Sequence, residues 1–268
     1  MIIFFALLGL VVGSFLGLCF WRIPHNESVI YPRSYCPNCN SKIKYFDNIP
    51  LISWIILKGR CRDCFANISL RYPLIEISTA ILWLLAYFSS PNNLYSGNTL
   101  FITIGGGIFF SYLLILSLLD TKYFWLPQSL CFQGIVIGLI FHFINSFVLI
   151  NPPKPSIFFD SLITSIFGLI IVEILCLSLK KIFGKELLGR GDAKLIALGS
   201  AWLGMQGILV ATCISFWIAS LFGIIGRLTN RLKPFQYIPF GPFLSIGFTI
   251  VWIVGGNRLW QYWENIIL

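Results

Sequence analysis

Two aspartates lie at the edges of long apolar runs. Asp120 closes one run in "LLDTKYFWLP", and Asp192 opens another in "GRGDAKLIALGSAWLG". Carboxylates are costly in a bilayer and are usually functional where they occur. Two carboxylates that share one proton can hydrolyse a peptide bond, because the ionised one takes a proton from water while the protonated one polarises the scissile carbonyl. The pair therefore predicts aspartic proteolysis, provided that the fold brings the two residues together.

Each acid also has a structural interpretation. Asp192 is a preferred residue type for capping the helix that follows it, and Asp120 suits a solvated loop beside Lys122. Glu76 and Glu173 lie in apolar runs as well, where an interfacial ion pair or a polar partner on another helix would explain them. The residue types alone leave these interpretations open.

Gly189 and Gly191 precede the second aspartate within a Gly-x-Gly-Asp motif. Glycine permits positive φ and the close approach of another backbone. An enzyme that accepts an extended peptide needs such an approach, so the glycines favour the catalytic interpretation.

Two Cys-x-x-Cys pairs, separated by 21 residues, have the spacing of a structural zinc site. They comprise Cys36, Cys39, Cys61 and Cys64. A loop of some 50 residues buries little apolar surface, so a metal would supply the stability that its core lacks. Free thiols or a single redox pair are the alternatives.

The composition predicts an all-α polytopic membrane protein. The 268 residues are 57% hydrophobic and only 11% charged, whereas a soluble domain has roughly 25% charged residues. Eight apolar runs predict about eight transmembrane helices. They cover residues 1–21, 74–90, 99–119, 129–150, 157–179, 193–205, 207–226 and 240–257.

The basic residues give these helices an orientation. Of the 19 Lys and Arg residues, 17 fall in one set of alternate loops, and only Lys154 and Arg258 fall in the other. By the positive-inside rule the basic set is cytoplasmic. The net charge of +9 is therefore interpreted as a determinant of topology and of contact with membrane lipids, and no nucleic acid is expected as a partner.

Three domains are expected. The first transmembrane helix covers residues 1–21 and is interpreted as retained rather than as a cleaved signal peptide. A cytoplasmic loop domain, stapled by zinc on four cysteines, covers 22–73. A membrane-embedded peptidase domain of about seven helices covers 74–268.

In order and spacing, several segments together resemble the type IV prepilin peptidases, the bifunctional leader peptidase/N-methyltransferases of bacterial pilus, competence and type II secretion systems. The segments are "GSFLGLCFWRIP", "CPNCNSKIKYFDNIPLISWIILKGRCRDC", "ISLRYPLIE", "LLDTKYFWLP", "GRGDAKLIALGSAWLG" and "IPFGPFLSIG".

The resemblance implies an intramembrane aspartyl protease with Asp120 and Asp192 as the catalytic pair. It implies cleavage of basic leaders from type IV prepilins or pseudopilins at the cytoplasmic face of the bacterial inner membrane, followed by N-methylation with S-adenosylmethionine. It also implies that the four cysteines belong to a metal-binding cytoplasmic loop, in agreement with the structural Zn²⁺ that their spacing predicts. No residues are assigned to the methyl donor, because no glycine-rich cofactor loop is visible.

The chain departs from the family pattern at two positions. Gln128 follows Leu126-Pro127 where family members often have aspartate, and Gly17 stands where they often have asparagine. Three alternative functions remain: a peptidase without methyltransferase activity, a non-catalytic zinc-loop scaffold for pilus or secretion assembly, and a transporter with acids as proton sites. A transporter would have charged groups nearer the bilayer midplane.

Overall fold

The structure, a computed structural model, describes residues 1–90, 99–184, 189–233 and 236–267. These residues form helices and no strands, apart from two isolated β-bridges. They divide into two compact units, Met1–Phe88 and Ser89–Leu268.

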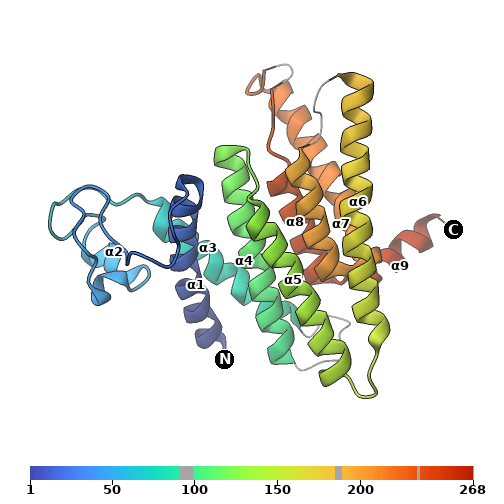
Figure 1. Cartoon of the computed structure of the whole chain (residues 1–268), viewed down its shortest axis with the longest axis horizontal. Coiled ribbons are helices and arrows are strands. Elements are labelled where there is room, and N and C mark those ends of the chain that lie inside the picture. The colour runs from blue at the N-terminus through green and yellow to red at the C-terminus, as the bar shows by residue number, and fades with distance from the viewer. Residues whose placement is uncertain (91–98, 185–188, 234–235, 268) are drawn as a thin grey trace. The chain divides into compact units, whose positions relative to one another are not determined.

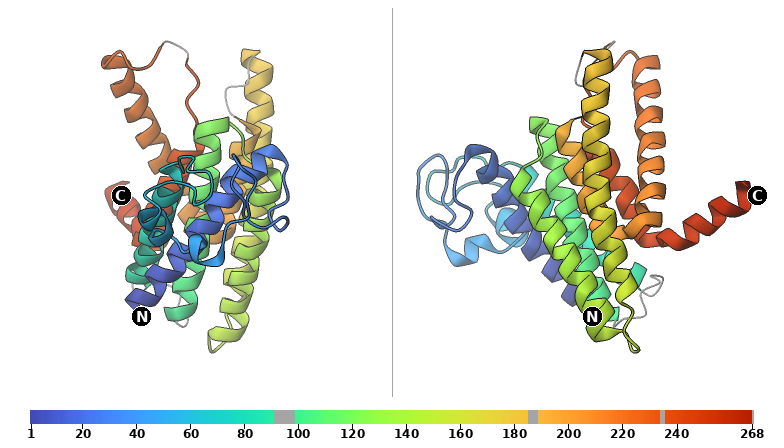
Figure 2. Two further views of the ribbon diagram at one scale, coloured as in Figure 1. Left: turned by 90° about the vertical axis from the view of Figure 1, so that its left-hand side faces the viewer. Right: turned by 45° about the vertical axis from the view of Figure 1, so that its right-hand side comes forward.

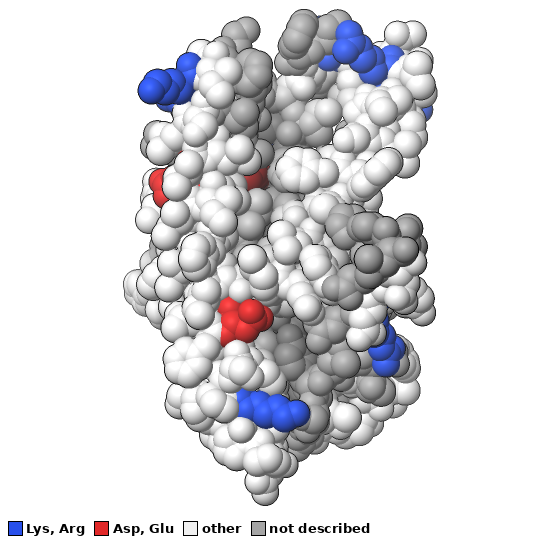
Figure 3. All heavy atoms as spheres, turned by 90° about the vertical axis from the view of Figure 1, so that its right-hand side faces the viewer, with Lys and Arg blue, Asp and Glu red and all other residues white. Residues whose placement is uncertain are grey.

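Six helices among the described residues are long and apolar enough to cross a membrane, which makes this a multi-pass membrane protein. The membrane-crossing segments are Ile2–His25, Arg71–Ser89, Thr99–Tyr123, Gln128–Leu149, Pro155–Ile182 and Gly191–Leu228. In Figure 3, basic side chains lie at the top and in the lower part of the view, and the broad surface between them is mostly uncharged, with a few acidic groups.

The first unit contains an antiparallel pair of helices, α1 (Ile2–Arg22) and α3 (Arg71–Ser89). Glycines on α1 allow their backbones to approach closely: a Cβ at Gly9 would lie 2.7 Å from the Cα of Ala80, and one at Gly13 would lie 2.6 Å from the Cα of Glu76. Small residues commonly mark such contacts in membranes. Gly9 and Gly13 therefore form a close helix–helix contact with α3.

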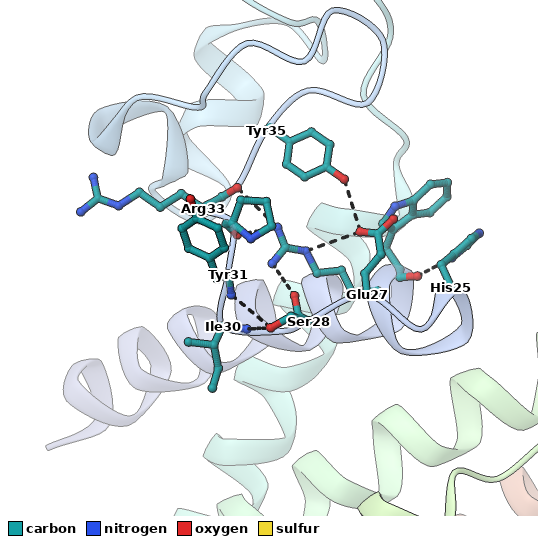
Figure 4. A network of polar contacts seen from close by, with 10 residues as sticks. His25, Glu27, Ser28, Ile30, Tyr31, Arg33 and Tyr35 are labelled. Carbon is teal, nitrogen blue, oxygen red and sulfur yellow. Dashed lines mark hydrogen bonds and ion pairs between the residues drawn. The ribbon is translucent and has the colours of Figure 1, made fainter.

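The segment between α1 and α3 is mostly irregular. It contains the short helices η1 (Ile23–His25), η2 (Tyr45–Asn48) and α2 (Ile52–Ile56). Arg22 fastens its beginning to the end of α1, because its guanidinium donates hydrogen bonds to the carbonyls of Ser28 (2.9 Å) and Pro32 (2.8 Å). Figure 4 shows this network, in which the hydroxyl of Tyr35 also donates to Glu27.

The second unit is a helical bundle (Figure 1). Its elements are α4 (Thr99–Tyr123), α5 (Gln128–Ile144), the π-helical turn η4 (Asn145–Leu149), α6 (Pro155–Phe183), α7 (Arg190–Leu228), α8 (Gly241–Val254) and α9 (Gly256–Ile267). Aromatic rings fill the space between four of these helices: Trp202 of α7 stacks on Phe109 of α4 (5.0 Å between ring centroids) and on Phe141 of α5 (5.2 Å), and Trp252 of α8 joins them. The bundle is therefore held together by a packed aromatic core.

Helix α7 is broken at Gly204, whose φ of 66° and ψ of −177° are accessible only to glycine. The carboxylate of Asp160 on α6 accepts a hydrogen bond from the N–H of Met205 (3.4 Å), one of the donors that the break exposes. A Cβ at Gly204 would lie 2.5 Å from the same carboxylate.

The two arms of α7 fold back on each other at this break. A Cβ at Gly247 of α8 would lie 2.5 Å from the carbonyl oxygen of Ala211, while a Cβ at Gly199 would lie 2.4 Å from the ring of the adjacent Phe248. In a continuous helix Gly199 and Ala211 would be about 18 Å apart. Because they contact two adjacent residues of α8, Phe248 and Gly247, the second arm must run back beside the first. Figures 1 and 2 show the resulting hairpin.

Every predicted apolar run coincides with helix, but the last run is shorter than expected. The prediction of 240–257 is corrected to Gly241–Val254, because Gly255 adopts a φ of 94° and ends the helix. The C-terminal helix α9 then follows.

Candidate active site

Asp120 lies near the C-terminal end of α4 and is 7% exposed. Its Oδ2 accepts a hydrogen bond of 2.8 Å from the backbone N–H of Gly241, the first residue of α8. The first N–H groups of a helix lack partners within it, so the carboxylate satisfies one of them. A Cβ at position 241 would lie only 2.7 Å from Oδ2, so this contact depends on glycine.

Asp192 lies in the first turn of α7 and is 8% exposed. Its Oδ2 accepts a hydrogen bond of 3.3 Å from the backbone N–H of Gly189, the residue that caps the helix. A carboxylate in the first turn is also stabilised by the helix dipole. The interpretation of Asp192 as the helix cap is therefore wrong: Gly189 is the cap, and Asp192 is the third helical residue, whose side chain reaches back to the N–H of the cap.

The fold brings the two aspartates together although 72 positions separate them. Their carboxyl groups are close enough to interact electrostatically. Neither forms an ion pair with a basic side chain in the part of the chain that the structure describes. Two buried carboxyl groups therefore share one site, and no basic side chain that the structure describes forms an ion pair with either.

Gly191 connects this site to the turn between α4 and α5. A Cβ at Gly191 would lie 3.1 Å from the side chain of Leu126, which is itself buried. Gly191 is therefore packed closely by a side chain, and the approach of another backbone stays a prediction. The expectation of positive φ is wrong, because Gly189 has a φ of −72° and Gly191 is helical.

Two residues that contact the site, Gly241 and Leu126, were not predicted from the sequence. Gly241 lies in the "FGP" segment, and Leu126 precedes Pro127, but neither residue type signals chemistry. Gln128, at the departure from the family pattern, accepts a hydrogen bond of 3.2 Å from Lys194. Lys194 is thereby directed toward α5.

The two other acids singled out in the sequence have different surroundings. Glu173 is exposed on α6. Glu76 belongs to the first unit, where its Oε2 accepts a hydrogen bond from the N–H of Leu51 (2.8 Å). On the loop, Arg62 holds Asp47 with two hydrogen bonds and keeps the pKa of that carboxyl below its usual value.

The four cysteines form one cluster. Their sulfur atoms all lie within 4.8 Å of one another, and Cys36 Sγ is 3.8 Å from Cys64 Sγ. Four thiolates around tetrahedral zinc, with Zn–S distances of about 2.3 Å, have sulfur atoms about 3.8 Å apart. None of the four is in a disulfide. The cluster is therefore compatible with zinc.

Two similar turns carry the cysteines. The N–H of Cys36 donates to the carbonyl of Ser41, and the N–H of Cys61 donates to that of Ala66, at the same spacing. A β-bridge closes each turn, Tyr35 with Lys42 and Arg60 with Asn67. The repeated geometry presents two sulfurs from each turn to one point.

The thiols in this cluster differ in acidity. Hydrogen bonding with Ser41 lowers the pKa of Cys39 to about 6, whereas burial raises the pKa of Cys36 to about 11. A metal that requires thiolate ligands would remove this difference by displacing the protons.

These features define the class: an all-helical, multi-pass membrane protein with two buried, interacting aspartates and a four-cysteine cluster. Residues 7–90 match the bacterial peptidase A24 N-terminal domain, and residues 107–224 match the type IV leader peptidase family. The chain belongs to the type IV leader peptidase family, the A24 peptidases.

Curated relatives match nearly the whole chain. It is 31% identical to the prepilin leader peptidase/N-methyltransferase of Neisseria gonorrhoeae, over 96% of this chain and 91% of the relative. It is 34% identical to the type 4 prepilin-like proteins leader peptide-processing enzyme of Escherichia coli O78:H11, over 89% and 88% respectively. It is 30% identical to the prepilin leader peptidase/N-methyltransferase of Pseudomonas aeruginosa, over 90% of this chain and 86% of the relative. No solved structure matches this chain.

Proposed function

We propose that this protein is an aspartic endopeptidase that removes basic leader peptides from type IV prepilin-like proteins, with Asp120 and Asp192 as the catalytic pair. The observation that carries the proposal is the meeting of two buried carboxyl groups, one from α4 and one from α7. Membership of the leader peptidase family and the names of the relatives support the substrate class.

The chemistry follows from the geometry of the pair. The ionised carboxylate removes a proton from water, whose oxygen attacks the scissile carbonyl carbon, and the protonated carboxyl donates a hydrogen bond to the carbonyl oxygen. The C–N bond then breaks as the leaving nitrogen takes a proton from the dyad. The backbone N–H of Gly241 binds Oδ2 of Asp120, and that of Gly189 binds Oδ2 of Asp192. The second oxygen of each carboxyl group is then available for these proton transfers.

The decisive experiment compares cleavage of a purified type IV prepilin by the wild-type protein with that by Asp120→Asn and Asp192→Asn. Each variant should lose at least about 10²–10⁴-fold in cleavage rate, because an amide cannot exchange the proton. Glu173→Gln is the matched control, since it neutralises an exposed acid on α6 of the same unit. If either aspartate variant folds and cleaves at near the wild-type rate, Asp120 and Asp192 are not the catalytic pair.

We also propose that the protein methylates the new N-terminal residue with S-adenosylmethionine. The relatives' names support this step. Mass spectrometry of the wild-type product tests it in the same experiment: a product heavier by one methyl group supports transfer, and an unmodified amine indicates a peptidase alone.

The four cysteines are proposed to hold a structural Zn²⁺ in the cytoplasmic loop domain of residues 22–73. Cys36, Cys39, Cys61 and Cys64 would be its ligands. The metal would crosslink the two turns and takes no part in the hydrolytic step proposed above.

The chain is proposed to cross the bacterial inner membrane eight times, with the dyad at the cytoplasmic face. The hairpin at Gly204 supports this count, because it makes two crossings out of α7. It implies that Arg231 and Lys154 lie on opposite sides, whereas an unbroken α7 would place them on the same side. Epitope tags inserted at these two positions of the full-length protein test this in spheroplasts: only the tag at Lys154 should bind an external antibody.

A further inference from the structure

Helix α2, within the cysteine-bearing loop, exposes three isoleucines together. Ile52, Ile55 and Ile56 are 54%, 65% and 68% exposed. Isolated exposed apolar residues are ordinary, but a contiguous group marks a contact with another molecule or with lipid. Nothing in the cysteine cluster or the aspartate pair accounts for this group.

The opposite side of α2 is firmly attached to its own unit. The N–H of Leu51, just before the helix, donates a hydrogen bond of 2.8 Å to Glu76 on α3. The indole of Trp54 donates to the carbonyl of Ile68 (3.3 Å) and packs against Gly59. These contacts fix the orientation of α2 within the first unit, and the other residues of that unit leave the isoleucine side exposed.

The attachment to Glu76 sets the depth of α2 along the two membrane-crossing helices. Glu76 meets α1 at Gly13, so the beginning of α2 lies at the level of both residues. Gly13 is about 17 Å along α1 from Ile2, and Glu76 is about 20 Å along α3 from Ser89, at 1.5 Å per residue. Ile2 and Ser89 lie at the same end of this antiparallel pair.

A hydrocarbon core is about 30 Å thick, so α2 begins some 10 Å below the face from which Arg22 and Arg71 emerge. Tilting the helices would shorten their projection and bury α2 more deeply. Raising α2 to the surface would instead leave the opposite ends of both helices about 10 Å inside the hydrocarbon, so that neither helix would cross the core of about 30 Å. The surroundings at this depth are lipid rather than water.

The charges next to α2 suit the same location. Lys58 and Arg60 follow the helix, and Arg60 is exposed. Long basic side chains at this boundary reach anionic headgroups while their stems cover apolar surface. A soluble protein partner would have to enter the leaflet to reach the isoleucines, so the depth favours lipid.

We propose that α2 is an interfacial membrane helix whose face of Ile52, Ile55 and Ile56 lies among the acyl chains of the leaflet on the Arg22 side, held there by Glu76. The loop is thus anchored in the bilayer by a third element besides α1 and α3. The inference gives Glu76 a role, because its carboxylate satisfies a backbone donor at a depth where water is absent. It does not depend on the peptidase proposal.

Photocrosslinking of the full-length protein in anionic phospholipid nanodiscs tests the proposal. A diazirine-bearing amino acid at Ile55 should insert into acyl chains, and the same probe at Asp63, an exposed acid in the second cysteine turn, should react with water. Intact mass spectrometry should detect at least about tenfold more lipid adduct at position 55 than at position 63. A probe at Ile56 repeats the test if the Ile55 variant does not purify as a folded protein.

Water adducts at positions 55 and 56 that match those at position 63 would overturn the proposal. Equal lipid labelling at all three positions would also overturn it, because the labelling would then describe the whole loop rather than the isoleucine face.

Discussion

At the scale of single residues, the orientation of the aspartate pair depends on backbone donors. Gly241 supplies an N–H to Asp120, and Gly189 supplies one to Asp192. A backbone donor stays neutral throughout a reaction, so it orients a carboxylate without neutralising its charge. The glycine at position 241 also lets α8 begin directly against that carboxylate.

Replacing Gly241 with alanine should therefore impair cleavage. The new Cβ would lie 2.7 Å from Asp120 Oδ2, so the carboxyl group must move. Misplacing a catalytic group by about 1 Å costs about 10²-fold in rate, and we expect a loss of that order. Cleavage of prepilin by the purified variant measures it.

Gly223→Ala is the matched control, because a Cβ at Gly223 meets nothing within 4 Å. This variant should cleave at the wild-type rate. Wild-type activity of Gly241→Ala would show that the contact with Asp120 does not position the dyad.

At the scale of elements, the break in α7 decides how the peptidase unit is built. The arm before Gly204 places Asp192 at its outer end and Trp202 in the aromatic core. The arm after it returns along α8. Asp160 supports the turn by binding the N–H of Met205, so one intramembrane acid has a structural explanation.

Gly204→Ala should destabilise the protein. Its backbone conformation costs a residue with a side chain of order 1–3 kcal/mol, and the added Cβ would also meet the Asp160 carboxylate. Thermal unfolding in detergent should have a midpoint several degrees below that of the wild-type protein. An unchanged midpoint, with Gly223→Ala as reference, would show that the hairpin tolerates a side chain there.

At the scale of the whole molecule, the chain forms two compact units with different sources of stability. The second unit has a packed aromatic core. The loop of the first unit has little buried apolar surface and gathers its four cysteines at one point. Structural zinc contributes folding free energy directly in such segments.

Purified protein should therefore contain one zinc ion per chain, and removal of the metal should loosen the loop selectively. Replacing Cys61 and Cys64 by serine should abolish zinc binding, measured by elemental analysis, and should make residues 22–73 sensitive to protease while the second unit stays intact. Cys213→Ser, a change outside the cluster, should retain the metal. Full zinc occupancy in the double variant would exclude the four-cysteine site.

The sequence by itself determined the apolar helices, the cysteine cluster and the identity of the acids that meet. These features are encoded locally: apolar runs have the length of a bilayer, and cysteine pairs have the spacing that one metal requires. Asp120 and Asp192 were found because carboxylates at the ends of apolar runs are conspicuous in any membrane protein.

Only the tertiary structure decided which groups hold those residues and how the loop is attached to α3. Gly241 contacts Asp120, which lies 121 positions away in the chain, and Glu76 binds Leu51, 25 positions away. Neither pairing can be recognised from the local sequence. The positive φ of Gly204 and Gly255 likewise depends on how the helices pack. Long-range packing places a carboxylate beside a particular backbone N–H, whereas local sequence specifies only that the carboxylate needs a partner.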